Sequence, residues 1–239
     1  MTSAVILAGG LGTRLLSAVP DLPKPMAPIN GSPFLEHQIC YWISQGINHF
    51  VISVGYLHQD IINYFGSQFE GASLDYVIEE SPLGTGGGLV LALKKVSQQE
   101  KFLLLNGDTY FKIKLKDLIN FSVENDADWC FSLFRTSELG RYLGMSILPD
   151  GQITSLQTDS SSMERLVNGG VYLVNPRALS SIQILSGSKV SLEQDIFPVA
   201  MRMGQRFFGK EYRDVFIDIG VPDDYYRAST ILTKLRESS

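Results

Sequence analysis

VILAGGLGTRLLSAVPDLPKPMAP, residues 5–28, is the stretch of this sequence that decides how the rest is interpreted. It begins inside a short apolar strand, 4–8, which opens into a glycine-rich turn at 9–13. Arg14 follows at once, and Lys24 lies between two prolines. Glycines let backbone N–H groups approach a ligand, and Arg and Lys bind phosphate oxygens through a planar fork and a point charge. A strand that leads into glycines and then cations indicates a phosphate-binding loop.

The two best-known phosphate loops do not fit this stretch. A Walker A loop needs Lys-Ser/Thr after its last glycine, whereas Thr13 and Arg14 follow Gly12. A dinucleotide-binding fingerprint needs a third glycine where Leu15 stands. For the glycines alone, an ordinary connection between a strand and a helix is the alternative.

Length and composition restrict the class of protein. The chain has 239 residues, is 44% hydrophobic and carries a formal net charge of −5, which suits an α/β domain and argues against a nucleic-acid partner. No apolar run approaches a membrane span, and the N-terminus enters a strand directly, so we expect no signal peptide and a cytoplasmic location. Cys40 and Cys130 lie in apolar segments and are expected to be buried, reduced thiols.

Hydrophobic periodicity predicts three β-α repeats and then a less regular half. Ser32 and Pro33 are predicted to begin the first helix, and 84–88 to form a second glycine-rich turn. Predicted strands are 4–8, 49–54, 74–79, 102–105, 128–134, 145–148, 153–156, 167–174, 207–208 and 215–219. Predicted helices are 32–45, 58–65, 88–96, 115–124, 176–182, 192–202 and 222–235. Apolar strands in β-α repeats indicate a parallel sheet covered on both faces, with an antiparallel insertion at about 128–174 that caps it.

Two aspartates follow apolar strands. Asp108 ends Asn106-Gly107-Asp108, and Asp218 ends FID. Ligands of open α/β sheets bind at the carboxyl ends of the strands, so we expect both aspartates at one edge. Two carboxylates that meet there repel each other unless a cation lies between them, and Mg²⁺ accepts such ligands together with substrate phosphates. A plain turn at Asp108 and a helix cap at Asp218 are the alternatives. The histidines, which are expected to be structural or solvent-facing, are His37, His49 and His58.

Five motifs together resemble a known family. LAGGLGTRL, PKPM, PLGTGG, NGD and DIG occur in this order along nearly the whole chain, and the set closely resembles the sugar-1-phosphate nucleotidyltransferases. The resemblance implies a Rossmann-like GT-A-type α/β fold, with a mostly parallel central sheet, helices on both faces and a small antiparallel insertion. It implies one domain over 1–239, with a nucleotide-binding half at about 1–127 and a sugar-phosphate-binding half at about 128–239.

The reaction implied by the resemblance joins an NTP and a sugar 1-phosphate into an NDP-sugar and pyrophosphate, with Mg²⁺. The implied catalytic residues are Arg14, Lys24 and Asp108, and the implied metal ligands are Asp108 and Asp218. The implied nucleotide-binding residues are Leu7, Ala8, Gly9, Gly10, Gly12, Thr13, Glu79, Glu80, Gly84 and Thr85. The implied sugar-phosphate-binding residues are Gly144, Asn168, Gly169, Gly170 and Glu193.

The sequence departs from the family at the sugar side. A Glu-Lys-Pro that many members carry before the sugar-binding strand is replaced by Leu156-Gln157-Thr158-Asp159, and Leu143 interrupts the usual Arg-Tyr-Gly. Arg141, Arg165 and Lys189 are the candidates to replace the missing lysine. The loss also leaves open a binding subunit that senses nucleotide sugars without turnover. The mismatch at Leu15 argues against an oxidoreductase.

The acidic pair Glu79 and Glu80 indicates which base is bound. Guanine presents N1–H and N2–H₂ donors on one edge, and one carboxylate can accept both, so GTP is favoured. KPMAPI, PLGTGG, VNGGVYL and FIDIGVPDDYYRA look most like the D-glycero-α-D-manno-heptose 1-phosphate guanylyltransferases, which serve capsule or lipopolysaccharide synthesis in bacteria. Mannose 1-phosphate guanylyltransferases and hexose 1-phosphate thymidylyl- or cytidylyltransferases share most of these motifs. The expected partners are therefore GTP and a sugar 1-phosphate, without nucleic acid or membrane, and a homodimer is left open.

Overall fold

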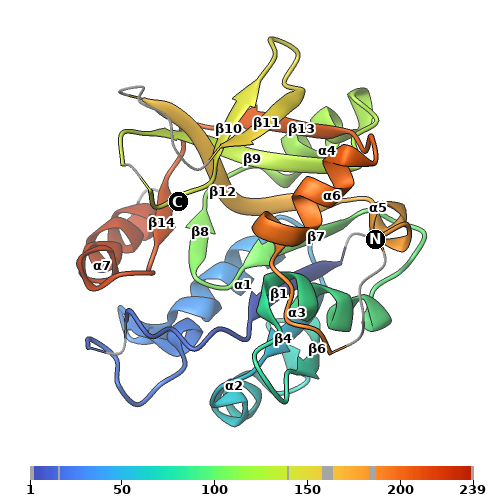
Figure 1. Ribbon diagram of the computed structural model, residues 1–239. Helices are drawn as coiled ribbons and strands as arrows, with labels where there is room; N and C mark the ends of the chain where they lie inside the picture. Colours follow the sequence, from blue (N-terminus) through green and yellow to red (C-terminus); the bar gives the residue numbers. More distant parts are fainter. Residues whose placement is uncertain (1–2, 16, 139, 158–163, 183–186, 238–239) are drawn as a thin grey trace.

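Four parallel strands form the centre of the main sheet, in the order β7, β1, β4 and β6 (Figure 1). The computed structural model describes residues 3–15, 17–138, 140–157, 164–182 and 187–237. The central strands are β7 (Phe102–Asn106), β1 (Ala4–Ala8), β4 (His49–Val54) and β6 (Ala72–Ile78). In β1, Val5 pairs with Val51 on one side and with Leu104 on the other. These strands are nearly continuous in apolar residues because helices cover both faces of a parallel sheet.

The antiparallel strands continue this sheet instead of forming a separate cap over it. Strand β12 runs antiparallel to β7, with Leu173 opposite Leu103. Strands β9 and β10 both pair with β12, β11 pairs with β10, and β13 runs parallel to β9. The described residues thereby form one sheet of ten strands. The remaining strands of the sheet are β5 (Gln68–Phe69), β9 (Trp129–Thr136), β10 (Gly144–Ile147), β11 (Ile153–Gln157), β12 (Arg165–Val174) and β13 (Phe207–Glu211).

Two short antiparallel pairs lie outside the main sheet. They are β2 (Pro28–Ile29) with β3 (Ser32–Pro33), and β8 (Thr109–Phe111) with β14 (Phe216–Asp218). In the second pair, Asp218 is opposite Thr109, the residue after Asp108. This pairing carries the two aspartates from distant parts of the chain to one place.

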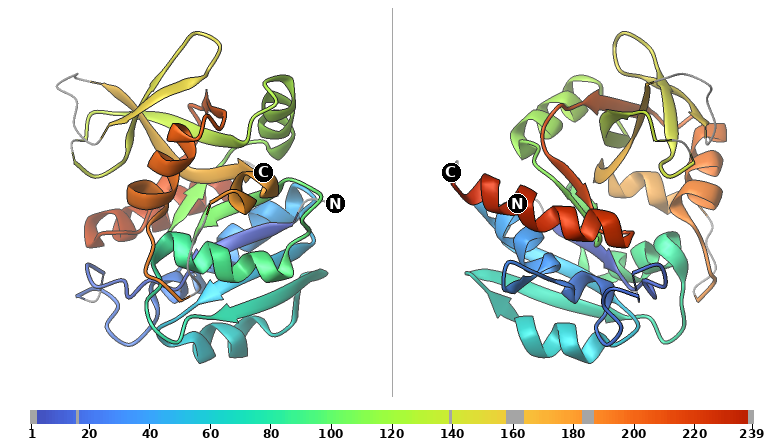
Figure 2. Two further views of the ribbon diagram at one scale, coloured as in Figure 1. Left: turned by 45° about the vertical axis from the view of Figure 1, so that its right-hand side comes forward. Right: turned by 90° about the vertical axis from the view of Figure 1, so that its left-hand side faces the viewer.

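Helices cover both faces of the sheet, as predicted (Figure 2). One core lies between the sheet and α1, α2 and α4, and a second lies between the sheet and α3, α5 and α6. Helix α7 packs beside β8 and β14 in a third cluster, which includes Ile217 and Ala228. The α-helices are α1 (Phe34–Ser44), α2 (His58–Phe65), α3 (Gly84–Ala92), α4 (Leu115–Glu124), α5 (Pro176–Ser180), α6 (Phe197–Arg202) and α7 (Pro222–Glu237). Shorter turns are the 3₁₀ segments η1 (Lys24–Met26) and η2 (Leu93–Lys95) and the π-helical segment η3 (Leu192–Ile196).

Two local predictions were wrong. Helix α1 begins at Phe34, because Ser32 and Pro33 pair with β2 and Pro33 is extended, with ψ of 145°. Residues 84–88 are the first turns of α3, not a loop. Glycine is unfavourable in the interior of an isolated helix, but the segment 188–190 packs so closely against Gly84, Gly86 and Gly87 that a side chain at these positions would collide with it. A Cβ on Gly84 would lie 2.6 Å from the carbonyl oxygen of Val190.

The cysteines and two of the histidines can be compared with their predicted environments. Cys130 is buried as predicted. Cys40 lies on the exposed side of α1, so the prediction that its thiol is buried was wrong. His37 Nε2 lies 2.9 Å from a backbone oxygen, and His49 pairs with Asp75. Within the described residues, no helix is both long and apolar enough to cross a membrane.

Candidate active site

Two adjoining pockets lie at the carboxyl ends of β1 and β7. The larger has a volume of about 260 Å³, and the smaller has a volume of about 110 Å³. Asn106 and Asp108 line both, so one wall is shared. The larger pocket is lined by Leu7, Ala8, Gly9, Gly10, Lys24, Pro25, Glu79, Pro82, Gly84, Thr85, Asn106, Gly107, Asp108 and Lys189. The smaller pocket is lined by Asn106, Asp108, Thr109, Arg141, Tyr142, Leu143, Asn168, Gly170, Glu193, Phe216 and Asp218.

Most of the residues predicted for the nucleotide lie together in the larger pocket. The exceptions are Gly12, Thr13, Arg14 and Glu80, which do not line it. Thr13 and Arg14 are exposed. Glu80 is also exposed and lines a neighbouring hollow, which Leu11 and Tyr56 share. Lys24 is therefore the predicted phosphate-binding cation that reaches the pocket.

The glycines of the first loop have different reasons to be glycine. A Cβ on Gly9 would lie 2.1 Å from Glu79 Oε1, and one on Gly12 would lie 2.8 Å from Lys24 Cβ. A Cβ on Gly10 would meet no described atom within 4 Å. Thus Gly9 and Gly12 make room for the side chains of Glu79 and Lys24, whereas the side of Gly10 that faces the pocket is open.

Glu79 is held by the protein at the end of β6. Its Oε1 accepts a hydrogen bond from Ser53 Oγ at 2.8 Å, and its Oε2 accepts one from the backbone N–H of Leu83 at 3.0 Å. The same Oε1 would be 2.8 Å from a Cβ on Gly88. The carboxylate is therefore fixed between β4 and the start of α3, at the wall of the larger pocket.

The predicted sugar-binding residues divide into two groups. Asn168, Gly170 and Glu193 line the smaller pocket, whereas Gly144 lines a different cavity beside β10. Gly169 packs against the aromatic ring of Phe111, which a Cβ would meet at 2.6 Å. The family resemblance implied that Gly144 and Gly169 bind the sugar phosphate, but neither lines the smaller pocket.

The Asn168 amide is used within the protein. Its Nδ2 donates to the Tyr172 hydroxyl at 2.5 Å and to Glu193 Oε1 at 3.3 Å, and its Oδ1 accepts the Gly170 N–H at 3.0 Å. Burial raises the pKa of Tyr172, so its hydroxyl stays neutral. Asn168 thus orients Glu193, whose carboxylate lines the smaller pocket.

Asp108 and Asp218 interact across the smaller pocket. Burial, and then the charge of Asp108, raise the pKa of Asp218, while Lys24 and Arg141 act in the opposite direction. Lys24 Nζ lies 2.5 Å from Asp108 Oδ2. Both carboxylates line the smaller pocket, and carboxylate oxygens are ligands of the kind that a divalent cation such as Mg²⁺ accepts.

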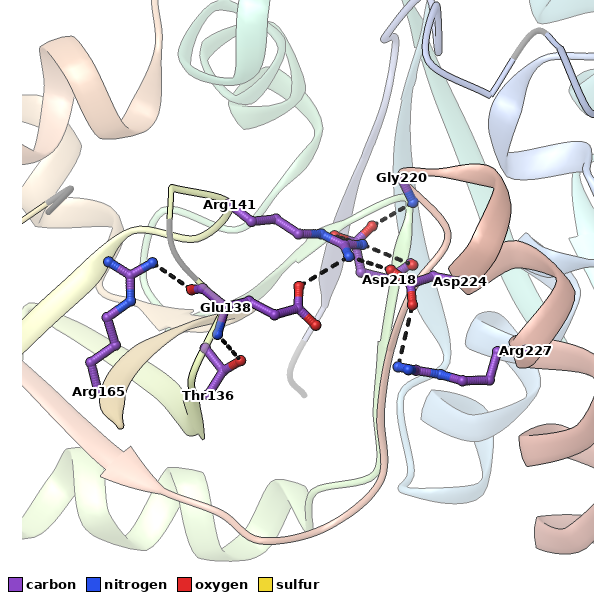
Figure 3. A network of polar contacts seen from close by, with 8 residues as sticks. All are labelled: Thr136, Glu138, Arg141, Arg165, Asp218, Gly220, Asp224 and Arg227. Carbon is purple, nitrogen blue, oxygen red and sulfur yellow. Dashed lines mark hydrogen bonds and ion pairs between the residues drawn. The ribbon is translucent and has the colours of Figure 1, made fainter. Parts of the chain in front are cut away.

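Arg141 connects Asp218 with two other carboxylates (Figure 3). Its guanidinium lies 3.0 Å from Asp218 Oδ2 and 3.2 Å from Glu138 Oε2, and it also pairs with Asp224. Burial opposes the charge on Arg141, but Asp218 and Asp224 raise its pKa. Asp218 Oδ1 accepts the Gly220 N–H at 2.6 Å. Donors therefore fix both oxygens of Asp218, which excludes a role confined to capping α7.

The three candidates for the missing lysine are now distinguishable. Arg141 is already bound to three carboxylates. Arg165 donates to the backbone oxygen of Glu138 at 2.7 Å and lines the cavity beside β10 (Figure 3). Lys189 lines the larger pocket together with Lys24 and Asp108. Of the replaced motif, Thr158 and Asp159 lie outside the described residues.

Sequence reasoning missed several residues of the site. Asn106 lines both pockets, although the NGD motif was interpreted only through its aspartate. Ser53 was missed altogether, although it is a polar residue inside the apolar strand HFVISV, and such a position is a detectable signal. Tyr142, Leu143 and Phe216 complete the smaller pocket through contacts that no local pattern reports.

Comparison with known proteins identifies the family. The model of the nucleotidyl transferase family matches residues 3–234. The D-glycero-alpha-D-manno-heptose 1-phosphate guanylyltransferase of Aneurinibacillus thermoaerophilus is 40% identical over 225 residues, which cover 94% of this chain and 96% of that protein. Its counterpart in Campylobacter jejuni is 37% identical over 93% of this chain and 96% of that protein. The crystal structure of HddC from Yersinia pseudotuberculosis complexed with GMP-PN superimposes with a TM-score of 0.84, at 33% identity, and covers 97% of this chain and 100% of that chain.

Proposed function

Because this chain belongs to the nucleotidyl transferase family, we propose that it transfers GMP from GTP to D-glycero-α-D-manno-heptose 1-phosphate. The products are GDP-heptose and pyrophosphate. The observation that carries the proposal is the shared wall of the two pockets, where Asp108 and Asn106 face both. A nucleoside triphosphate in the larger pocket and a sugar phosphate in the smaller one would meet at this wall. We further propose that GDP-heptose supplies a surface polysaccharide and that the enzyme acts in the cytoplasm as one catalytic domain.

The chemistry requires no covalent intermediate. A sugar phosphate oxygen is an anion at neutral pH, so it attacks the α-phosphorus directly, a P–O bond forms, and the bond to pyrophosphate breaks. The principal barrier is the repulsion between two polyanions. Lys24 would neutralise the triphosphate, and Asp108 and Asp218, which line the smaller pocket together, would hold Mg²⁺. When bound, Mg²⁺ would supply charge neutralisation at the phosphates.

The test of the proposed function is a matrix of nucleotides against sugar 1-phosphates, read by pyrophosphate release. GTP, ATP, CTP, UTP and dTTP would each be paired with the 1-phosphates of D-glycero-α-D-manno-heptose, mannose and glucose. We expect GTP with the heptose 1-phosphate to give the highest kcat/KM. A best pair containing dTTP or CTP would overturn the guanylyl assignment, and no release from any pair would overturn transferase activity.

We predict that Glu79→Gln lowers the preference for GTP over ATP by about tenfold, because an amide cannot accept from both guanine N1–H and N2–H₂. Glu79 lines the larger pocket, so its carboxylate is placed beside the proposed base. The measurement is kcat/KM for each nucleotide at saturating sugar 1-phosphate. Glu80→Gln is the matched control, since Glu80 is exposed outside this pocket and its variant should keep the preference. An unchanged preference in Glu79→Gln would remove Glu79 from base recognition.

We also predict that Lys189→Met lowers kcat/KM for the sugar 1-phosphate by about tenfold, the effect of losing one charge-assisted hydrogen bond. Lys189 shares the pocket wall with Asp108, where the sugar phosphate would meet the nucleotide. Lys94→Met is the control, because Lys94 is exposed in η2 and lines neither pocket. If both variants match the unmodified enzyme, Lys189 does not replace the missing lysine.

A further inference from the structure

Ser53 is a buried polar residue in a central strand of the sheet. It lies near the end of β4, where its exposed fraction is 0%, and its neighbours Ile52 and Val54 are equally buried. A buried hydroxyl costs free energy unless it forms a hydrogen bond. Its hydrogen bond goes to Glu79 Oε1, so this residue is coupled to a side chain at the pocket wall.

Both carboxylate oxygens of Glu79 accept a hydrogen bond from the protein. Ser53 Oγ donates to one oxygen, and the Leu83 N–H donates to the other. A carboxylate has about four lone-pair positions, so both oxygens keep capacity for donors of a ligand. The two donors come from different elements, β4 and the turn before α3, and therefore fix the plane of the carboxylate as well as its position.

Two glycines confine the same carboxylate from the sides. Side chains at Gly9 and Gly88 would come within 2.1 Å and 2.8 Å of Glu79 Oε1, and one at Gly88 would also come within 2.9 Å of Ser53 Oγ. Glu79 is consequently enclosed by Gly9, Gly88, Ser53 and the Leu83 N–H. The glycine at 88 makes room for the hydrogen bond between Ser53 and Glu79, a role unrelated to phosphate.

We propose that Ser53 is a positioning residue for base specificity, which orients the Glu79 carboxylate so that it accepts both donors of the guanine edge. The proposal rests on the proposed function, because it requires Glu79 to bind guanine. Ser53 itself does not line the larger pocket, so it acts through Glu79. Without the hydroxyl, the carboxylate keeps only the Leu83 N–H and can rotate away from one of the two guanine donors.

The discriminating measurement is the ratio of kcat/KM for GTP to that for ITP, whose base lacks the 2-amino group. In the unmodified enzyme this ratio reports the second hydrogen bond from guanine. Ser53→Ala should lower the ratio about three- to tenfold, while the KM for sugar 1-phosphate changes less than twofold. Gly88→Ala should lower the ratio as well, because its Cβ displaces the carboxylate from the other side.

Ser132→Ala is the matched control for lost stability. Ser132 has the same exposed fraction of 0%, lies in strand β9, and donates to the backbone oxygen of Val171 at 3.0 Å. It should lower the melting temperature to a similar extent and leave the GTP:ITP ratio unchanged. If Ser53→Ala does not fold, Ser53→Cys keeps the volume with a weaker donor and should give an intermediate ratio.

The outcomes separate this proposal from the proposed function. A folded Ser53→Ala or Ser53→Cys with an unchanged ratio, beside a Glu79→Gln with a lowered ratio, overturns the role of Ser53 alone. A ratio near one in the unmodified enzyme, or no effect of Glu79→Gln, overturns guanine recognition by Glu79 and the role of Ser53 together.

Discussion

Replacing Asp108 with asparagine should lower the rate of Mg²⁺-dependent pyrophosphate release at saturating substrates by about 1,000-fold. Asp108 lines both pockets, and its charge raises the pKa of Asp218. It therefore lies where the two substrates and the metal would meet. Electrostatic stabilisation at the reacting phosphates is the principal contribution available to this chemistry, and the loss of one such group costs roughly 100- to 1,000-fold. Asp218→Asn should have a similar effect, since its two oxygens are held toward the same pocket.

Metal binding must be measured apart from turnover. Mn²⁺ titrated into each variant with a non-hydrolysable GTP analogue, and followed by electron paramagnetic resonance, should bind at least tenfold more weakly, since one of two carboxylate ligands is lost. Asp75→Asn is the control, because Asp75 is also paired with a lysine, Lys95, but lies on the surface of β6. Normal Mn²⁺ affinity and full activity in either site variant would remove that aspartate from the metal site.

Much of this site could be predicted because its residues lie at strand ends. The apolar strands 4–8 and 102–105 can be predicted from composition, and the carboxyl ends of parallel strands lie at one edge of a sheet, so Gly10 and Asp108 were expected at the same edge. Asp218 could be added because it also ends a strand. Its partner strand β8 was not predicted, since three residues carry too little periodicity.

The remaining features depend on contacts between distant segments. Residues 84–88 were predicted to form a turn, but they begin α3, where the segment 188–190 packs on Gly84, Gly86 and Gly87. The Gly86 N–H donates to the backbone oxygen of Val190 at 2.8 Å. Asn168 was expected to bind the sugar, and it lines the smaller pocket, but its amide also forms hydrogen bonds with Tyr172 and Gly170. Arg14 was predicted to bind phosphate because it follows the glycines closely in sequence, but the loop leaves its side chain exposed and outside the larger pocket. Sequence patterns identify residues whose side chains could bind phosphate or sugar, whereas packing decides which of those side chains line the pockets.

The second large effect is expected at Lys24. Lys24→Met should lower kcat/KM for GTP by about 100- to 1,000-fold, because it removes a cation that lines the larger pocket, where the triphosphate would bind. Pro23 and Pro25 enclose Lys24 in the 3₁₀ turn η1, and Gly12 packs against its side-chain stem, so the ammonium is held in place. Lys24→Arg should restore only part of the rate, since a guanidinium is longer and planar. Activity of Lys24→Met within threefold of the unmodified enzyme would contradict this role.

The double variant Lys24→Met/Asp108→Asn tests whether the pair acts as a unit. Lys24 and Asp108 are 2.5 Å apart, with side-chain exposures of 11% and 35%, so each single change alters the surroundings of the other. We therefore expect the combined loss in kcat/KM to be at least tenfold smaller than the product of the single losses, as for groups that work together in catalysis. The surface pair Lys95 and Asp75, with exposures of 42% and 43%, provides the matched cycle, in which every variant should keep full activity. Multiplicative losses at Lys24 and Asp108 would mean that the two residues act on separate steps, with Lys24 serving only to bind GTP.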